Sequence, residues 1–265
     1  MRVTSEWTPY YEYAGDDPRE TLLGALDRFA EPGLAVDLGC GSGRDTFELL
    51  RRGWRVLAID AEREAIERLL AHTALDLSRL ETQLARFEDA AWPDADLVSA
   101  SFALPFCRPE HFRALWERVV ASLRPGARFC GQLFGDRDEW ASTHAEMTFH
   151  TRGEVERLLS DLDVEELDEA EEDGPTALEP VKHWHVFHVV ARRPLTAAVR
   201  RPAALLAAEC RVAPPPKRDI AVRALACRAA IRRIHRSASP LRWSGLKVSK
   251  VSSLHRTTDL QRNGV

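Results

Sequence analysis

The sequence lacks the features that mark a secreted or membrane-spanning protein. It has no uninterrupted apolar stretch of the about 18 or more residues that a spanning helix requires, and its first residues, Met-Arg-Val-Thr-Ser-Glu, lack the apolar run of a signal peptide. The five cysteines form no Cys-x-x-Cys pair and have no histidine at metal-ligand spacing, which predicts reduced thiols and no metal site. We therefore expect a cytoplasmic protein without a membrane span.

Charge is distributed unevenly along the chain. Residues 1–194 hold 22 Lys and Arg against 38 Asp and Glu, a net charge of −16, whereas residues 195–265 hold 15 against 3, a net charge of +12. This predicts a domain over 1–194, long enough to bury a core, and a basic C-terminal extension over 195–265. A basic helix at 218–236 could bind either nucleic acid or a membrane surface. We favour a poorly ordered extension.

Apolar segments of strand length alternate with helical patterns along residues 1–194. Strands are predicted near 34–38, 54–59, 84–87, 96–101, 127–134, 162–167 and 183–191, and helices near 18–30, 43–52, 61–71, 109–122 and 152–160. The alternation predicts an α/β fold, a Rossmann-like parallel sheet with helices on both faces. Only an acidic loop, 168–180, separates the last two strands, so they are expected to form an antiparallel hairpin that reverses the last strand of the sheet.

A glycine-rich segment follows the first predicted strand. Residues 37–43 read Asp-Leu-Gly-Cys-Gly-Ser-Gly, and Asp60 ends the second strand. Glycines let a ligand approach the backbone, the helix that follows presents free N–H groups, and an acid at the second strand's end can accept hydrogen bonds from two ribose hydroxyls. A dinucleotide loop reads Gly-x-Gly-x-x-Gly, whereas here the third glycine comes one residue early. The spacing and the extra acid, Asp37, disfavour an NAD-dependent oxidoreductase.

Residues 37–43 resemble the first motif of the class I S-adenosylmethionine (SAM) dependent methyltransferases, Asp or Glu-x-Gly-x-Gly-x-Gly. The resemblance covers about residues 7–193, includes the Leu-Arg-Pro-Gly-Ala turn at 123–127, and is nearest to the tellurite-resistance and thiopurine-type small-molecule enzymes. It implies a seven-stranded sheet with a reversed last strand, SAM as the cofactor, and in-line methyl transfer to a small molecule. The alternative is a SAM-binding protein without transferase activity, whose basic tail is an interaction arm.

The resemblance also implies a cofactor site. It places the loop glycines at the methionine and ribose portion with Asp37 near the amino-acid end, Asp89 in preference to Glu88 at the adenine amino group, and Ser101 and Phe102 beside the sulfonium. Asp60 either holds the ribose or only caps the next helix, Asp89 can equally be a turn residue, Phe102 can simply pack in the core, and Arg19 or Arg44 can meet the SAM carboxylate. The predicted cofactor-binding set is Asp37, Gly39, Cys40, Gly41, Gly43, Arg44, Asp60, Ala61, Asp89, Ala90, Ser101 and Phe102.

The catalytic residues are not fixed by the sequence. An acidic nucleophile needs a general base, usually histidine, and His150, His183 and His185 lie on the predicted rim of the sheet, with His188 expected deeper along its strand. Each can instead be a packing residue. In the family the N-terminal segment, residues 1–30, folds over the active site as a lid, which makes Tyr10 and Tyr11 further candidates. The alternative for this segment is a hydrophobic clasp on the sheet edge.

Two motifs of other methyltransferase classes are missing. The fourth strand is followed by Ser-Phe-Ala-Leu-Pro-Phe instead of the Asn or Asp-Pro-Pro-Tyr type sequence of amino-directed enzymes, and no Pro-Cys nucleophile of the cytosine-C5 type occurs. The acidic charge of residues 1–194 disfavours a phosphate backbone as the partner. We expect a small-molecule methyl acceptor, which the sequence does not identify, and the oligomeric state is open.

Overall fold

The computed structural model describes residues 7–13, 15, 17–72, 76–177 and 179–195. In these ranges one sheet holds the strand order β3-β2-β1-β4-β5-β8-β7, with the short β6 beside β5. The strands are β1 Leu34–Leu38, β2 Arg55–Asp60, β3 Leu80–Leu84, β4 Ala95–Ala100, β5 Leu123–Gly135, β6 Phe149–His150, β7 Asp163–Gly174 and β8 Lys182–Arg192. Strand β8 runs antiparallel to both β5 and β7, which confirms the predicted Rossmann-like fold with a reversed last strand. The predicted extension, 195–265, lies outside the described residues except for Leu195.

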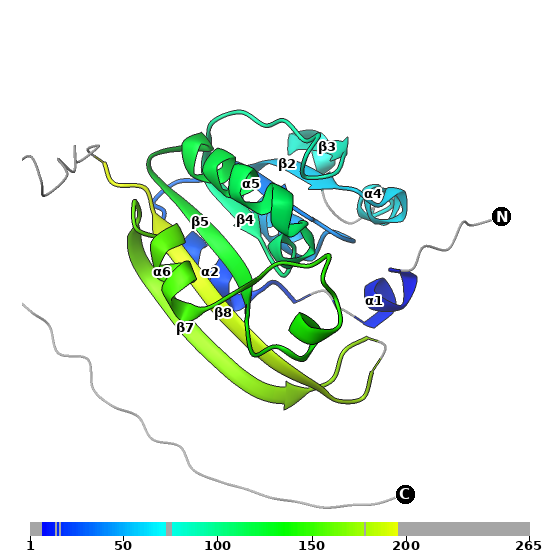
Figure 1. Ribbon diagram of the computed structural model, residues 1–265. Helices are drawn as coiled ribbons and strands as arrows, with labels where there is room; N and C mark the ends of the chain where they lie inside the picture. Colours follow the sequence, from blue (N-terminus) through cyan, green and yellow to red (C-terminus); the bar gives the residue numbers. More distant parts are fainter. Residues whose placement is uncertain (1–6, 14, 16, 73–75, 178, 196–265) are drawn as a thin grey trace, which may run out of the picture. The chain divides into compact units, whose positions relative to one another are not determined.

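Helices cover both faces of the sheet (Figure 1). They are α1 Thr8–Tyr13, α2 Glu20–Leu26, α3 Arg44–Arg51, α4 Arg63–Leu70, α5 Pro109–Ser122 and α6 Arg152–Leu158, with short 3-10 turns at Leu77–Arg79, Leu104–Phe106 and Glu139–Ser142. Apolar residues of α2, α3 and α4 pack with one set of strand side chains, and those of α5 and α6 pack with the alternate set. Successive strand residues point to opposite faces, so the sheet is buried on both sides.

Strand β3 lies earlier in the chain than the predicted 84–87. It pairs with β2 from Val56↔Leu80 to Asp60↔Leu84, so it ends level with Asp60, and the chain then turns at Arg86, whose carbonyl accepts the N–H of Ala90 at 2.9 Å. The prediction for this strand was wrong because its apolar signal is weak: all five residues of this edge strand are half-buried or exposed.

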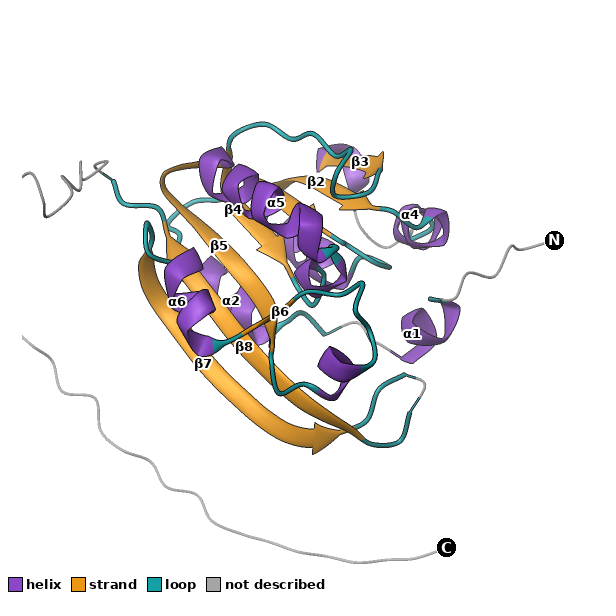
Figure 2. Cartoon of the chain, viewed as in Figure 1, coloured by secondary structure: helices purple, strands orange, loops and turns teal. Residues whose placement is uncertain are grey.

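The predicted acidic loop, 168–180, is also wrong over its first half, because β7 continues to Gly174. Five acids among the seven residues 168–174 are atypical of a strand, yet β7 is an edge strand whose acids face solvent or cations. Glu169 and Glu171 both form ion pairs with Arg137, at 3.0 and 2.7 Å. Figure 2 shows β5, β7 and β8 as the long strands of the sheet. Within the described ranges, no helix combines the length and apolarity needed to cross a bilayer.

Candidate functional site

The strand register places several polar residues in one row at the carboxyl ends of the parallel strands. Leu38 pairs with Ile59 and Ala100 with Gly131, so the next residues, Gly39, Asp60, Ser101 and Gln132, stand level with one another. Gln132 in turn pairs with His188 on β8. Ligands of open α/β sheets bind at this edge, and the row therefore defines the candidate site.

The glycine loop is tied to the end of β2. The N–H groups of Gly39 and Cys40 both donate to the carbonyl of Ile59, at 2.8 and 3.1 Å. The carboxylate of Asp60 accepts the N–H of Gly41 and the N–H of Glu62, each at 2.8 Å. Burial raises the pKa of Asp60. The predicted role as cap of the next helix is wrong, because α4 begins at Arg63 and its N-cap is Glu62. A carboxylate has about four lone-pair positions, so two stay available for the predicted ribose contact.

Gly39 has no room for a side chain. Its φ is 69°, in the left-handed region, and a Cβ there would lie 2.4 Å from the Cβ of Ala103. We predict that Gly39→Ala lowers the free energy of unfolding by about 2 kcal/mol, from backbone strain and the clash together. Urea denaturation checks this. Gly153→Ala is the control, since its Cβ would meet only Arg157 at 3.6 Å; an equal loss in both variants would contradict the prediction.

Two buried carboxyl groups lie beneath the loop. Thr46 Oγ1 donates to Asp37 at 2.6 Å, and Asp45 accepts the Ser101 hydroxyl at 2.5 Å and the backbone N–H of Arg19 at 2.9 Å. Burial first, and then repulsion by Asp45, raises the pKa of Asp37 to about 7. A ligand with positive charge would relieve this repulsion. Sequence reasoning missed Asp45, because an acid in the first turn of a helix is common without any ligand.

Phe102 has an unusual backbone conformation. Its φ of 53° is the one positive value among the described residues other than glycine, and its N–H donates to Gln132 Oε1 at 3.0 Å. Such strain is found preferentially at functional sites. The Phe102 ring is half-buried and lies under the guanidinium of Arg19, 4.6 Å from Cζ to the ring centroid.

Helix α1 packs against the glycine loop. Tyr11 Cε1 lies 3.8 Å from the position that a Cβ on Gly41 would occupy, Thr8 donates to Glu64 at 2.6 Å, and the Trp7 ring meets Phe106 at 4.9 Å between centroids. Burial, together with the charge of Asp60, raises the pKa of Tyr11, so its phenol stays protonated at neutral pH. The described part of the predicted lid therefore contacts α4 through Thr8 and the turn after β4 through Trp7.

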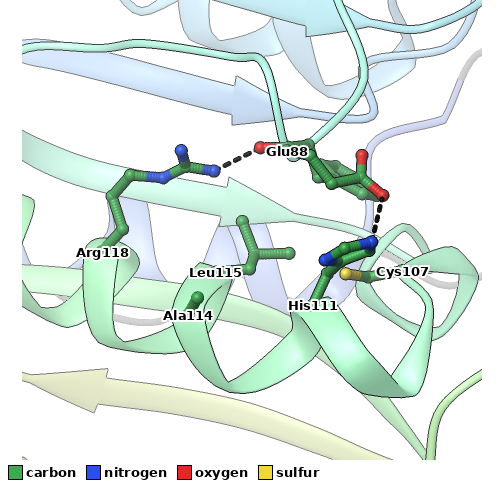
Figure 3. A pocket seen from close by; sticks show the side chains of 7 residues that line it. Glu88, Cys107, His111, Ala114, Leu115 and Arg118 are labelled. Carbon is green, nitrogen blue, oxygen red and sulfur yellow. Dashed lines mark hydrogen bonds and ion pairs between the residues drawn. The ribbon is translucent and has the colours of Figure 1, made fainter.

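Asp89 and Ala90 lie in the turn after β3, beside a cavity of about 140 Å³ (Figure 3). The cavity is lined by Phe87, Glu88, Cys107, His111, Ala114, Leu115 and Arg118. Arg118 donates to the Phe87 carbonyl, and His111 stands 3.9 Å from Glu88. The tip of the Phe87 ring lies 3.8 Å from the Cβ position of Gly39, so this ring separates the cavity from the glycine loop.

The three histidines predicted on the rim lie away from the row. His185 is fully buried, accepts the backbone N–H of Arg137 at Nδ1 (3.1 Å), and places Nε2 2.9 Å from Glu169. His183 lies between Asp173 and Glu171, which raise its pKa. His150 packs on Phe112 at 4.6 Å between centroids, and burial lowers its pKa. All three belong to the part of the sheet that extends past the other strands.

His188 was expected deeper along β8, and this was wrong. Strands β5 and β8 extend beyond the ends of β1 and β4. The first residues of β8 therefore lie past the row of polar residues, and His188 is the residue of β8 that lies level with it. Its ring centroid lies 6.3 Å from that of Phe102. The signals available in the sequence were a polar residue, Gln132, inside an otherwise apolar strand, and the length of β8.

Part of the chain matches a family model and a group of curated proteins in sequence. Residues 35–126 match the family described as a methyltransferase domain. A carboxy-S-adenosyl-L-methionine synthase of Vibrio cholerae serotype O1 is 33% identical over 114 residues, 40% of this chain and 46% of that protein. The chain thus spans about half the length of the curated relatives it matches.

Solved structures share the fold at low sequence identity. TehB from Haemophilus influenzae superposes with a TM-score of 0.59 at 16% identity, covering 71% of this chain and 66% of that one. The 1,6-didemethyltoxoflavin-N1-methyltransferase of Burkholderia thailandensis, solved with bound 1,6-didemethyltoxoflavin and S-adenosylhomocysteine, gives a TM-score of 0.50 at 21% identity, covering 66% of this chain and 77% of that one. These solved structures share the chain's fold, that of class I SAM-dependent methyltransferases, and residues 35–126 carry the match to a methyltransferase domain.

Proposed function

We propose that the protein binds SAM at the glycine loop and transfers its methyl group to a small molecule. The observation that carries this is the loop Gly39–Gly43 beside Asp60. All three of its glycines have positive φ, Gly39 and Gly43 have no room for a Cβ, and the Asp60 carboxylate keeps two lone-pair positions for hydroxyls. The buried carboxyls of Asp37 and Asp45 suit the positive charges of SAM and would be poor neighbours for a pyrophosphate.

Different residues of the site would hold different parts of SAM. Asp60 would hold the ribose, the backbone of 39–43 with Cys40 and Ala61 would line it, and Asp89 with Ala90 would meet the adenine next to Phe87. Arg44, whose pKa burial lowers, is our candidate for the cofactor carboxylate. When bound, SAM supplies an electrophilic methyl group on a sulfonium sulfur.

The chain's own contribution to the proposed reaction is positioning. Holding two reactants in line can provide about 7–11 kcal/mol of the barrier reduction. Ser101 and Phe102 are fixed by hydrogen bonds to Asp45 and Gln132, and Tyr11 of α1 packs over Gly41 of the loop. A short lid over a half-buried loop supports a small acceptor. The buried free thiols of Cys40, Cys107 and Cys130 are compatible with a cytoplasmic location.

Calorimetry followed by an activity screen tests this function. We expect saturable binding of SAM, no binding of NAD, and release of S-adenosylhomocysteine with at least one acceptor from a panel of thiols, phenols, amines and carboxylates. SAM binding with no product from any acceptor would favour the alternative, a binding protein without transferase activity. Mass spectrometry of the same reactions would reveal carboxy-SAM, the product that the names of the sequence relatives imply. Binding of NAD in place of SAM would refute the proposal.

The raised pKa of Asp37 predicts that SAM affinity depends on pH. Its folded-state value of about 7 lies above the ordinary value of 3.8, so the free protein holds a proton here that the unfolded chain releases, and this contribution to stability is lost as pH rises toward 7. A cationic ligand favours the ionised carboxyl. SAM affinity should therefore rise by up to roughly tenfold from about pH 6 to pH 7.5.

Calorimetry at both pH values measures this change, with Asp37→Asn as the matched variant. The neutral amide cannot titrate, so its SAM affinity should stay nearly constant over the same range. An equal pH dependence in both proteins would contradict the assignment to Asp37.

A further inference from the structure

Gln132 links Phe102 to His188 through a chain of hydrogen bonds in which the donor and the acceptor of each bond are determined. Gln132 is 1% exposed. Its Oε1 accepts the Phe102 N–H at 3.0 Å, and because a backbone N–H can only donate, this contact fixes the orientation of the amide. The amide nitrogen therefore faces Thr21 Oγ1 at 3.0 Å and His188 Nδ1 at 3.3 Å.

The amide orientation decides the state of the His188 ring. An amide nitrogen donates hydrogens and accepts none, so Nδ1 of His188 must be the acceptor. A neutral imidazole with an acceptor at Nδ1 carries its hydrogen on Nε2. Burial lowers the pKa of His188 by more than the charge of Asp168 raises it, and Arg19 lowers it further, which opposes a second proton. His188 thus presents an N–H donor and has no free lone pair for use as a base.

His188 shares its surroundings with a cation and two aromatic rings. The Phe102 ring lies 6.3 Å from His188 and 6.4 Å from Trp184 between centroids, and the Arg19 guanidinium lies over it. All four side chains are half-buried. The acids nearest His188, namely Asp168, Glu20 and Glu172, are exposed to solvent. This cluster directly adjoins Ser101 and the glycine loop.

We propose that the cluster of Arg19, Phe102, Trp184 and His188 selects an aromatic methyl acceptor that binds as an anion, a thiolate or phenolate, with His188 as a hydrogen-bond donor through Nε2–H. This inference rests on the proposed methyl transfer. The anion's lone pair forms the new bond to the methyl carbon, the electron pair of the broken C–S bond stays on sulfur, and no proton passes to the protein. The aromatic rings pack on the acceptor, and Arg19 balances its charge.

The test uses two probe acceptors, thiophenol and 4-nitrothiophenol, whose thiols ionise at different pH. For the wild-type protein at saturating SAM, the pH at which kcat/KM for the probe reaches half its maximum should move with the pKa of the probe. An enzyme base would give the same midpoint for both probes, which would overturn the proposal. If SAM binds and neither probe is methylated, the proposal also fails, whereas absence of SAM binding would be the separate failure of the proposed function.

Variants separate a donor from a base. His188→Gln keeps an N–H donor and should retain kcat/KM within about tenfold, whereas His188→Leu should raise KM by at least roughly tenfold, the value of one hydrogen bond to a charged group. Equal loss in both would overturn the donor role. Arg19→Met should also raise KM, while Arg113→Met, an exposed arginine on α5, should leave it unchanged. Nitrogen-15 NMR of the His188 ring reads the tautomer directly, and a proton on Nδ1 would contradict the assignment.

Discussion

Replacing Asp60 with alanine is expected to weaken SAM binding by about 100-fold or more. Hydrogen bonds to a charged group contribute roughly 1.5–3 kcal/mol each, and the carboxylate has two lone-pair positions left for the ribose hydroxyls. The substitution also releases the N–H groups of Gly41 and Glu62, which Asp60 holds at 2.8 Å. The loop would then lose the contact that fixes its shape, so calorimetry should record a large rise in Kd.

Asp76→Ala is the matched control for this substitution. Asp76 accepts the N–H of Ser78 at 2.9 Å, a turn contact like that of Asp60 with Glu62, but it precedes β3 at the opposite end of the strands. SAM binding should be unaffected. A threefold change in Kd corresponds to about 0.7 kcal/mol of binding free energy. If the Kd of Asp60→Ala stayed within threefold of the wild-type value, the assignment of this carboxylate to the ribose would be wrong.

Replacing Lys182 with methionine is expected to destabilise the fold by about 3–5 kcal/mol. Lys182 and Asp138 are both fully buried and form an ion pair at 2.5 Å. The ammonium lies 3.6 Å from the ring centroid of Trp184 and 4.4 Å from that of Trp140. Methionine would fill similar space but would leave the Asp138 carboxylate buried without its counter-charge. Urea denaturation should show this loss, a large part of the about 5–15 kcal/mol that stabilises a typical domain.

A double variant separates the lost ion pair from lost packing. In Lys182→Met with Asp138→Asn no charge stays buried, so part of the stability should return. Arg113→Met, which breaks the exposed pair with Glu117, should cost less than about 1 kcal/mol. If Lys182→Met lost no more stability than this surface variant, the buried ion pair would not be a major contributor to the stability of the fold.

The glycine loop and Asp60 could be predicted from the sequence because their signal is local. A short apolar strand, alternating glycines and an acid at the end of the next strand occupy fixed positions along the chain, and the fold follows from the alternation of strands and helices. Register along the paired strands then places Gly39, Asp60 and Ser101 in one row.

The other side of the site could not be predicted because it depends on strand lengths. His183 and His185 belong to the overshooting part of β8, and only the pairing of Gln132 with His188 shows which histidine reaches the row. Gln132 itself stood out only as a polar residue in an apolar strand. Its orientation depends on Phe102, which is distant in sequence. Contacts of this kind become visible when the strands are paired.

The most direct test of the account is a crystal structure of the full chain grown with S-adenosylhomocysteine. We expect the ribose hydroxyls on the Asp60 carboxylate and the backbone of residues 39–43 against the ligand, with the thioether sulfur beside Phe102. A ligand bound elsewhere, or none at a concentration that saturates the protein in solution, would contradict it.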